Sequence, residues 1–178
     1  MEPTTDLARH QRILLGLIRA NYAVAREDHP YFHQVAASPD LQEARGNIYL
    51  WRVYVLERTC VLTMALLRQR GLLEAALEAF IRSRNVSPFR EYQPLAFLAS
   101  LAEHPDPLLV SVSQFELALM KVREGDPGSY TVAWATDPHS VLHCLAQNVP
   151  LEPCGLCGAW RTRVAADLPH LFDVQHGG

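Results

Sequence analysis

The sequence predicts a mainly α-helical fold followed by a small α+β lobe. Apolar residues recur at helical spacing through residues 1–124, which indicates amphipathic helices. Residues 129–136 instead alternate large and small side chains and are rich in strand formers. The turn signal Asp126-Pro127-Gly128 separates the two regions. We therefore expect a helical domain of about six helices over residues 1–125 and a small lobe over residues 126–178.

The first helix is expected along a run that ends before Pro30. Its apolar positions share a helical spacing and are Leu7, Leu14, Ile18, Tyr22 and Ala25. His29 stands beside Pro30, so we expect it to be a cap or loop residue. Ser38 followed by Pro39 predicts a capped start for a short helix that ends near Arg45.

The next helix is expected between Asn47, as its cap, and Gly71, which ends it in a left-handed conformation. Its apolar positions lie on most sides of the helix and are Ile48, Leu50, Trp51, Val53, Tyr54, Val55, Val61, Leu62 and Leu66. A helix that is apolar nearly all round belongs inside a bundle. The sequence therefore predicts that this helix forms the centre of the domain.

Three further helices complete the first region. The first carries apolar residues from Leu73 to Ile81 at helical spacing, and a second starts at Pro94. The last begins at Asp106-Pro107 and ends before Gly125.

The C-terminal lobe is expected to contain a strand, a helix and a hairpin. Residues 129–136 form the strand, and Asp137-Pro138 caps a short helix with Val141, Leu142 and Leu145 facing inward. Residues 160–166 and 171–175 then pair as a hairpin. This order predicts a small winged-helix-like lobe.

Charge and composition exclude several classes of partner. The 178 residues hold 16 basic and 19 acidic side chains, for a net charge of −3. This balance lacks the basic excess that phosphate binding requires, so we expect no nucleic-acid partner. The longest apolar stretch is interrupted by charged residues, so we expect no membrane partner. The small number of cysteines favours a cytoplasmic protein.

Cys154 and Cys157 form the most distinctive metal-ligating motif. Two thiolates at this spacing can bind zinc, and His139 and His143, four residues apart on an expected helix, could supply two more ligands. The alternative is a tight turn whose cysteines behave as small buried apolar residues. We favour that alternative, with zinc as the weaker hypothesis, and predict no cofactor in this chain.

The strand at residues 129–136 suggests a way to bind a peptide. If it lies at a sheet edge, the backbone around Tyr130, Val132 and Trp134 can accept an extended peptide as an added strand. Arg161 and Arg163 would then share one face of the neighbouring strand and could hold acidic side chains of that peptide. The equally weighted alternative is an internal strand with solvated arginines. Val132→Pro would weaken peptide binding if the amide of Val132 is used.

Motifs of nucleophilic or nucleotide-dependent catalysis do not occur in the sequence. We therefore name no catalytic residue and expect no catalysis from this chain alone.

Several segments, taken in order, resemble a known family. They are Phe80-Ile-Arg82, Ser87-Pro88, Tyr92, Phe97-Leu98 and residues 115–119. Over about residues 45–175, this order resembles the partner proteins of multinuclear non-haem iron oxygenases. Within that group the chain is most similar to the methanobactin-biosynthesis subunits of the MbnC type, which are related to the HvfC-like partners.

The resemblance implies a specific role. Such a partner forms a heterodimer with an iron oxygenase of the MbnB type, and the iron ligands come from the oxygenase. The complex uses dioxygen to convert cysteines of a ribosomal precursor peptide into oxazolone and thioamide groups, which later bind copper. The resemblance therefore implies that residues 1–125 dock the oxygenase and that residues 126–178 bind the peptide leader.

Overall fold

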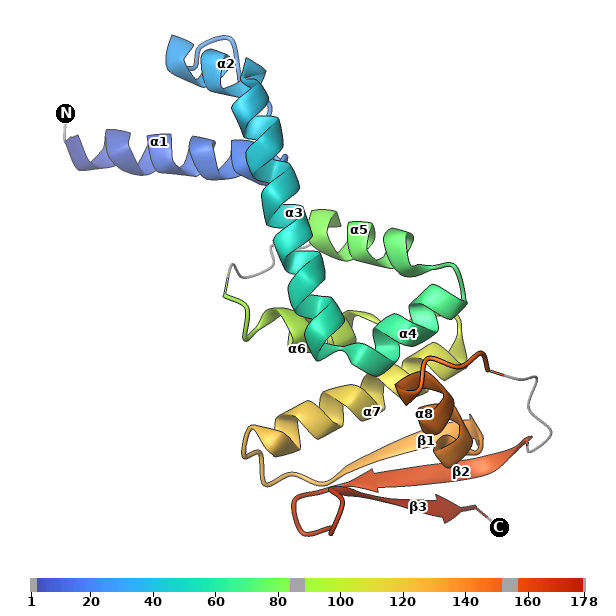
Figure 1. Ribbon diagram of the computed structural model, residues 1–178. Helices are drawn as coiled ribbons and strands as arrows, with labels where there is room; N and C mark the ends of the chain where they lie inside the picture. The colour runs from blue at the N-terminus through green and yellow to red at the C-terminus, as the bar shows by residue number, and fades with distance from the viewer. Residues whose placement is uncertain (1–2, 84–88, 152–156, 178) are drawn as a thin grey trace. The chain divides into compact units, whose positions relative to one another are not determined.

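The computed structural model describes residues 3–83, 89–151 and 157–177. These residues form a mainly helical structure with a small three-stranded antiparallel sheet, as the sequence predicts at this coarse level (Figure 1). The helices are α1 (Pro3–Ile18), α2 (Pro30–Ala37), α3 (Pro39–Thr59), α4 (Val61–Gln69), α5 (Leu73–Ser83), α6 (Gln93–Ser100), α7 (Pro107–Arg123) and α8 (Pro138–Ala146). The strands are β1 (Tyr130–Thr136), β2 (Cys157–Val164) and β3 (Phe172–His176).

The chain forms two compact units, residues 1–53 and residues 54–178. The position expected for a domain boundary, near residue 125, lies within the second unit. There α7 packs directly against β1, on the other side of the turn at Asp126.

The first unit has its own small core. Its buried residues are Ile13, Leu17, Phe32 and Leu41, and Leu14, Tyr22, Val24, Val35 and Ala36 pack around them. The expectation of one helix as far as Ala25 is wrong, because α1 ends at Ile18 and Ala20 adopts a left-handed φ of 56°. The guanidinium Nε of Arg45 donates to the carbonyl of Leu17 (2.9 Å), which satisfies the helix end from a distant part of the chain.

Asp28 orders the loop that follows α1. Its carboxylate accepts hydrogen bonds from the Tyr22 hydroxyl (2.6 Å), the Ala25 amide (2.9 Å) and the Arg9 guanidinium (3.2 Å). These bonds, led by the one from Tyr22, lower the pKa of Asp28. Next to this loop, His29 caps α2 by accepting from the Tyr31 amide (3.2 Å), which confirms its expected capping role.

The boundary expected between two helices near Asn47 is wrong. Ser38 does accept from the Asp40 amide (3.1 Å), as predicted, but α3 continues without a break from Pro39 to Thr59. The break comes instead at Cys60, and Gly71 then adopts the expected left-handed φ (67°) after α4. The actual break has a tertiary cause, because a carboxylate from another helix caps the start of α4.

That carboxylate is Glu116 of α7. Its two oxygens accept hydrogen bonds from the amides of Leu62 (2.9 Å) and Thr63 (3.0 Å), which are among the orphan donors at the start of α4. Glu116 itself is only 6% exposed. Burial raises its pKa despite the opposing effect of the two backbone hydrogen bonds.

Only the later part of the expected central helix lies in a core. On α3, Ile48, Leu50 and Trp51 are exposed, whereas Val55 and Leu56 are buried. The buried residues continue along α4 and are Met64, Ala65, Leu66 and Leu67. The apolar pattern therefore includes both exposed and buried positions, and periodicity alone does not distinguish them.

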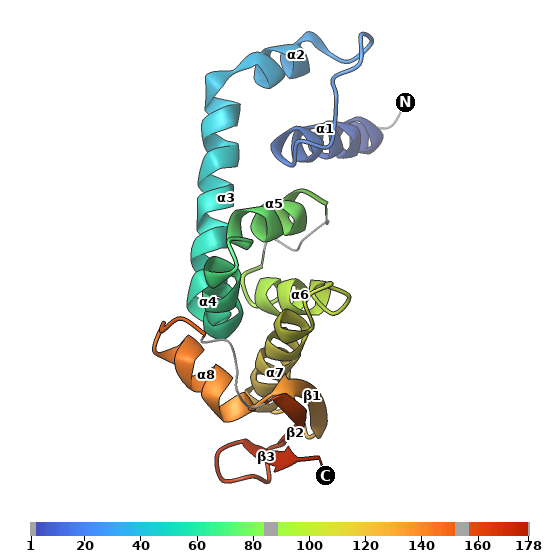
Figure 2. The same ribbon diagram turned by 90° about the vertical axis from the view of Figure 1, so that its right-hand side faces the viewer.

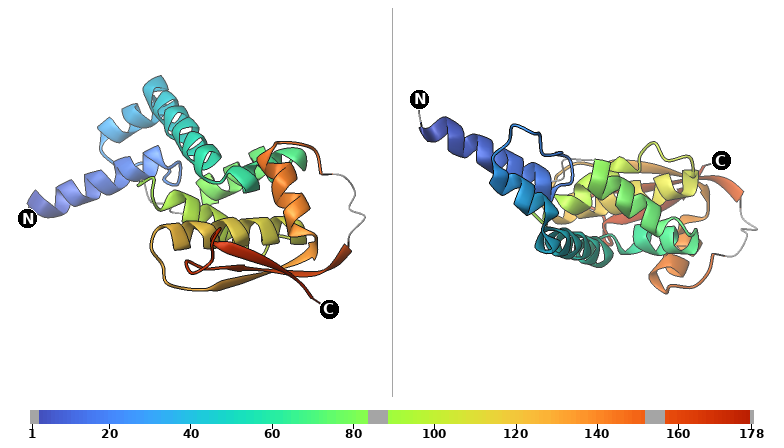
Figure 3. Two further views of the ribbon diagram at one scale, coloured as in Figure 1. Left: turned by 60° about the horizontal axis from the view of Figure 1, so that its bottom comes forward. Right: turned by 90° about the horizontal axis from the view of Figure 1, so that it is seen from above.

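The core of the second unit lies around α4, α6 and α7. Its large fully buried apolar side chains are Leu56, Met64, Leu66, Leu67, Phe97, Leu98, Leu109, Phe115 and Leu145. On the other side of α7 lies the sheet, which α7 covers on one face (Figures 2 and 3). Phe115 of α7 packs on this sheet, with its ring 5.9 Å from that of Trp134 on β1 and 5.1 Å from that of Phe172 on β3. Contacts from α7 therefore hold the sheet in place.

The caps at the starts of α7 and α8 agree with the sequence. Asp106 accepts from the Leu108 amide (2.9 Å), and Asp137 accepts from the His139 amide (3.1 Å). Among the helices of the described residues, none combines the length and the apolar composition needed to cross a bilayer.

Candidate functional site

The outer edge of β1 is the candidate site. The strand order is β1-β2-β3, so in the described part of the chain β1 has a strand neighbour on one side only. Val132 and Trp134 are buried toward α7, whereas Thr131, Ala133 and Ala135 are exposed on the opposite, open face. Of the two readings that the sequence left open, the structure therefore supports an edge strand over an internal one.

The register of the sheet decides which backbone groups of β1 point outward. Between β2 and β3, the Ala165 amide donates to the Leu171 carbonyl (2.9 Å), and the Gly177 amide donates to the Ala159 carbonyl (2.6 Å). Backbone groups alternate in direction along a strand, so the odd-numbered residues of β2 bond to β3. The even-numbered residues of β2 consequently bond to β1.

The even-numbered residues of β2 pair with Tyr130, Val132 and Trp134 of β1. The amide and carbonyl of each of these residues therefore point inward, and those of Thr131 and Ala133 point outward. A hydrogen bond agrees with this assignment, because the Ser111 hydroxyl of α7 donates to the carbonyl of Ala133 (2.7 Å). Thr131 offers both its amide and its carbonyl to an added strand.

This geometry corrects the substitution that the sequence suggested. The amide of Val132 belongs to the ladder with Thr162 of β2, so Val132→Pro would damage the sheet rather than remove a contact to a peptide. The outward backbone groups belong to Thr131 and Ala133. The Trp134 side chain is buried, and its indole N–H donates to the Thr162 hydroxyl (2.9 Å), so it is not available at the edge. The sequence shows the alternation but not the register, so it could not separate the two sets.

Arg161 and Arg163 both lie on β2, opposite Ala133 and Thr131 respectively, and their side chains share the open face. Arg163 is already engaged, because its guanidinium contacts both oxygens of Asp167 (3.1 and 2.9 Å) and the Ser129 hydroxyl (3.1 Å). Arg161 is exposed beside the small Ala133 side chain, so its long side chain can reach over that residue toward the edge. The two arginines are thus brought together, but they differ in availability.

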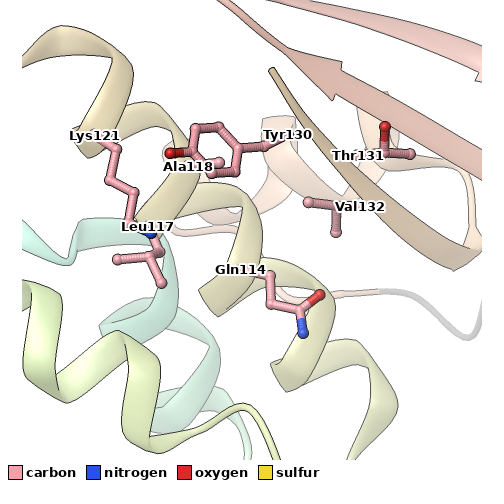
Figure 4. A pocket seen from close by; sticks show the side chains of 7 residues that line it. All are labelled: Gln114, Leu117, Ala118, Lys121, Tyr130, Thr131 and Val132. Atoms are coloured by element: carbon pink, nitrogen blue, oxygen red, sulfur yellow. The ribbon is translucent and has the colours of Figure 1, made fainter. Parts of the chain in front are cut away.

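A pocket opens between α7 and the beginning of β1 (Figure 4). Its volume is about 170 Å³. It is lined by Gln114, Leu117, Ala118 and Lys121 from α7 and by Tyr130, Thr131 and Val132 from β1. The pocket therefore adjoins the edge at Thr131, whose amide and carbonyl both point outward.

Two electrostatic contacts fix the wall formed by Tyr130. Its hydroxyl donates to Asp126 (2.7 Å), a bond that raises the pKa of Tyr130 and lowers that of Asp126. The Lys121 ammonium lies 5.1 Å from the centre of the Tyr130 ring, within the range of a cation–π contact. One contact holds the hydroxyl and the other lies over the ring, so this side of the pocket is preorganised.

The proposed zinc ligands are only partly described. His139 and His143 lie on α8, as expected, and Cys157 opens β2 in register with Thr136. Cys154 lies outside the described residues. Within the described ranges, no three His, Cys, Asp or Glu side chains gather as a metal-binding group.

Sequence reasoning missed the contribution of α7 to this site. Gln114, Leu117 and Lys121 occupy a helix whose opposite, buried face gave the stronger signal in the sequence. Lys121 is the chain's only lysine among fifteen arginines, which was the one available hint. Comparisons with family models, with curated proteins and with solved structures found no match to this chain.

Proposed function

We propose that this chain is a non-catalytic subunit that recruits a ribosomal precursor peptide to an iron- and dioxygen-dependent oxygenase. In this proposal the iron belongs to the oxygenase chain, and the product carries oxazolone and thioamide groups made from peptide cysteines, as in methanobactin biosynthesis. The winged-helix-like lobe after residue 125 holds the peptide leader, and the helices before it dock the oxygenase. A related oxygenase that acts on a different ribosomal peptide is the nearest alternative.

The observation that carries the proposal is the outer edge of β1. An extended peptide can pair with the outward amide and carbonyl of Thr131 and with the outward amide of Ala133. Backbone pairing supplies affinity for many sequences, and neighbouring side chains supply selectivity. Arg161 adds a cationic group on the open face, which suits an acidic peptide.

Exposed apolar side chains support the docking role of the helices. Among the residues whose exposure the structure describes, most of the large exposed apolar ones lie before residue 62. They are Leu7, Leu15, Ile18, Tyr31, Ile48, Leu50, Trp51, Tyr54 and Val61. Leu50 is 64% exposed and Trp51 is 46% exposed, although both lie in the middle of a long helix. Exposed aromatic and aliphatic side chains such as Trp51 and Leu50 are suited to be anchor residues for a partner protein.

The first experiment is co-purification with a candidate oxygenase encoded beside this chain, with a tag on one chain only. The proposal expects one peak of one-to-one complex on size exclusion, with iron following the oxygenase chain. Leu50→Asp and Trp51→Asp should split this peak, whereas Val149→Asp, an exposed apolar residue in the C-terminal lobe, should leave it intact. Two separate peaks for the unmodified chains would contradict the docking role.

The second experiment tests the edge. Thr131→Pro removes an outward amide and should abolish binding of the precursor peptide to the purified complex. Val174→Pro is the matched control, because the same register analysis directs the Val174 amide to the outer edge of β3. Equal peptide affinity in folded Thr131→Pro and wild-type protein would rule out strand addition at β1.

The alternative of a zinc protein that uses Cys154, Cys157, His139 and His143 has a direct test. Metal analysis of the chain, purified without chelators, gives about one zinc per chain if that hypothesis holds. A ratio near zero eliminates it.

A further inference from the structure

The pocket beside β1 has the position of a side-chain subsite for an added strand. Side chains of directly paired residues in neighbouring strands lie on the same face of a sheet. Val132 points toward α7 and lines the pocket, so a peptide residue opposite Val132 also points toward α7. It enters the pocket between β1 and the α7 side chains Gln114, Leu117 and Ala118.

The chemistry of this part of the pocket is mostly apolar. Val132, Leu117 and Ala118 contribute aliphatic carbon, and Gln114 lies at the exposed rim. A volume of about 170 Å³ is suited to a single side chain of moderate size rather than to a free cofactor. The occupant that fits is an aliphatic residue.

The next inward-facing position of the peptide meets a different environment. In an antiparallel arrangement, the residue two positions later lies opposite Tyr130 and next to Lys121. Among the described residues, no carboxylate lies within ion-pair distance of the Lys121 ammonium. The adjacent Asp126 accepts the Tyr130 hydroxyl, and the Lys121 charge acts on it only at longer range, where it helps to lower the pKa of Asp126. Lys121 is therefore available to an acidic side chain of the peptide.

We propose that the pocket between α7 and β1 selects peptides with an aliphatic residue followed, two positions later, by an acidic residue. This inference rests on the proposed strand addition and adds the sequence pattern that the site reads. The aliphatic side chain fills the pocket opposite Val132, and the carboxylate pairs with Lys121. The intervening residue uses its backbone to bond Thr131 and directs its side chain to the open face.

The test uses the full-length chain and a library of random nine-residue peptides displayed on phage. Enriched peptides are synthesised with a fluorophore, and their affinities are measured by fluorescence anisotropy. The proposal expects enrichment of the aliphatic-x-acidic pattern. Replacing the acidic residue by its amide should weaken binding by roughly tenfold, the scale of one charge-assisted hydrogen bond.

A charge reversal separates recognition from folding. Lys121→Glu should change the residue enriched two positions after the aliphatic one from acidic to basic. A merely structural defect would not do this. Arg123→Glu is the matched control, since it makes the same charge change two residues along α7, outside the pocket lining. It should leave the preference unchanged.

The outcomes distinguish this inference from the function on which it rests. If peptides bind, Thr131→Pro abolishes binding and Lys121→Glu leaves the preference unchanged, strand addition stands and the pocket inference is overturned. If peptides bind equally to wild-type protein and Thr131→Pro, strand addition and the pocket inference are both overturned. If no peptide is enriched by the wild-type chain, both are likewise overturned. If the preference reverses in Lys121→Glu but not in Arg123→Glu, both strand addition and the pocket inference are supported.

Discussion

Removal of the Glu116 carboxylate should destabilise the second unit, because this group closes the start of α4 from another helix. The Leu62 and Thr63 amides donate to its two oxygens at 2.9 and 3.0 Å. Glu116→Ala leaves both donors without their acceptor, whereas Glu116→Gln retains one acceptor oxygen and turns an NH₂ group toward the other amide. The two variants therefore remove the cap in two steps.

The expected magnitudes follow from the burial of the site. An unpaired buried donor costs about 1–3 kcal/mol, and removal of a desolvated charge offsets part of that cost. We expect Glu116→Ala to lower the free energy of unfolding by about 2–3 kcal/mol and Glu116→Gln by about 1 kcal/mol. Glu103→Gln, on an exposed glutamate, should change it by less than about 0.5 kcal/mol.

Urea unfolding followed by circular dichroism measures these differences, and hydrogen exchange at Leu62 and Thr63 localises them. The folded-state pKa of Glu116 is raised above its ordinary value of 4.5, so the folded chain binds this proton more tightly than the unfolded chain. The part of its stabilisation that is linked to protonation is therefore fully present below pH 4.5 and declines as the pH rises through the folded-state pKa. Glu116→Gln should remove that slope. Unchanged urea midpoints in both Glu116 variants would refute the capping argument.

Three further predictions concern individual side chains. Asp28→Asn should reduce the loss of stability at acidic pH. The pKa of Asp28 is lowered, so its contribution to stability is present above pH 3.8 and lost as the pH falls through the folded-state pKa. A pH series of thermal unfolding tests this. Gly16→Ala should lower the melting temperature rather than raise it, since an added Cβ would lie 2.6 Å from the Tyr22 Cβ. Cys60 is fully buried and its pKa is raised to about 12, so iodoacetamide at pH 8 should modify it only in urea, as mass spectrometry of peptides would show; rapid labelling of the native chain would contradict this.

The sequence was most informative where short-range chemistry sets the structure. Asp106 and Asp137 each precede a proline and cap the helices that follow, as expected. The alternation of large and small residues in residues 129–136 likewise predicted the strand that the structure shows at Tyr130–Thr136. These features depend on neighbours within a few residues, so a single sequence contains the information that determines them.

Distant partners explain the features that the sequence did not predict. The chain breaks its helix at Cys60 rather than near Asn47, because Glu116, more than fifty residues away, supplies the acceptor for the new helix start. Arg45 similarly closes the end of α1 at Leu17. Neither partnership leaves a periodic signal, since each depends on how separate helices pack.

The same distinction applies to the candidate site. The sequence by itself determined that a strand with Val132 and Trp134 on one face precedes two arginines on a later strand. Only the tertiary structure decided that β1 lies at the edge, that Thr131 and Ala133 direct their backbone groups outward, and that α7 places Lys121 beside them. The physical reason is that side-chain alternation is a local property of the chain, whereas strand order and register are set by pairing and packing between segments distant in sequence.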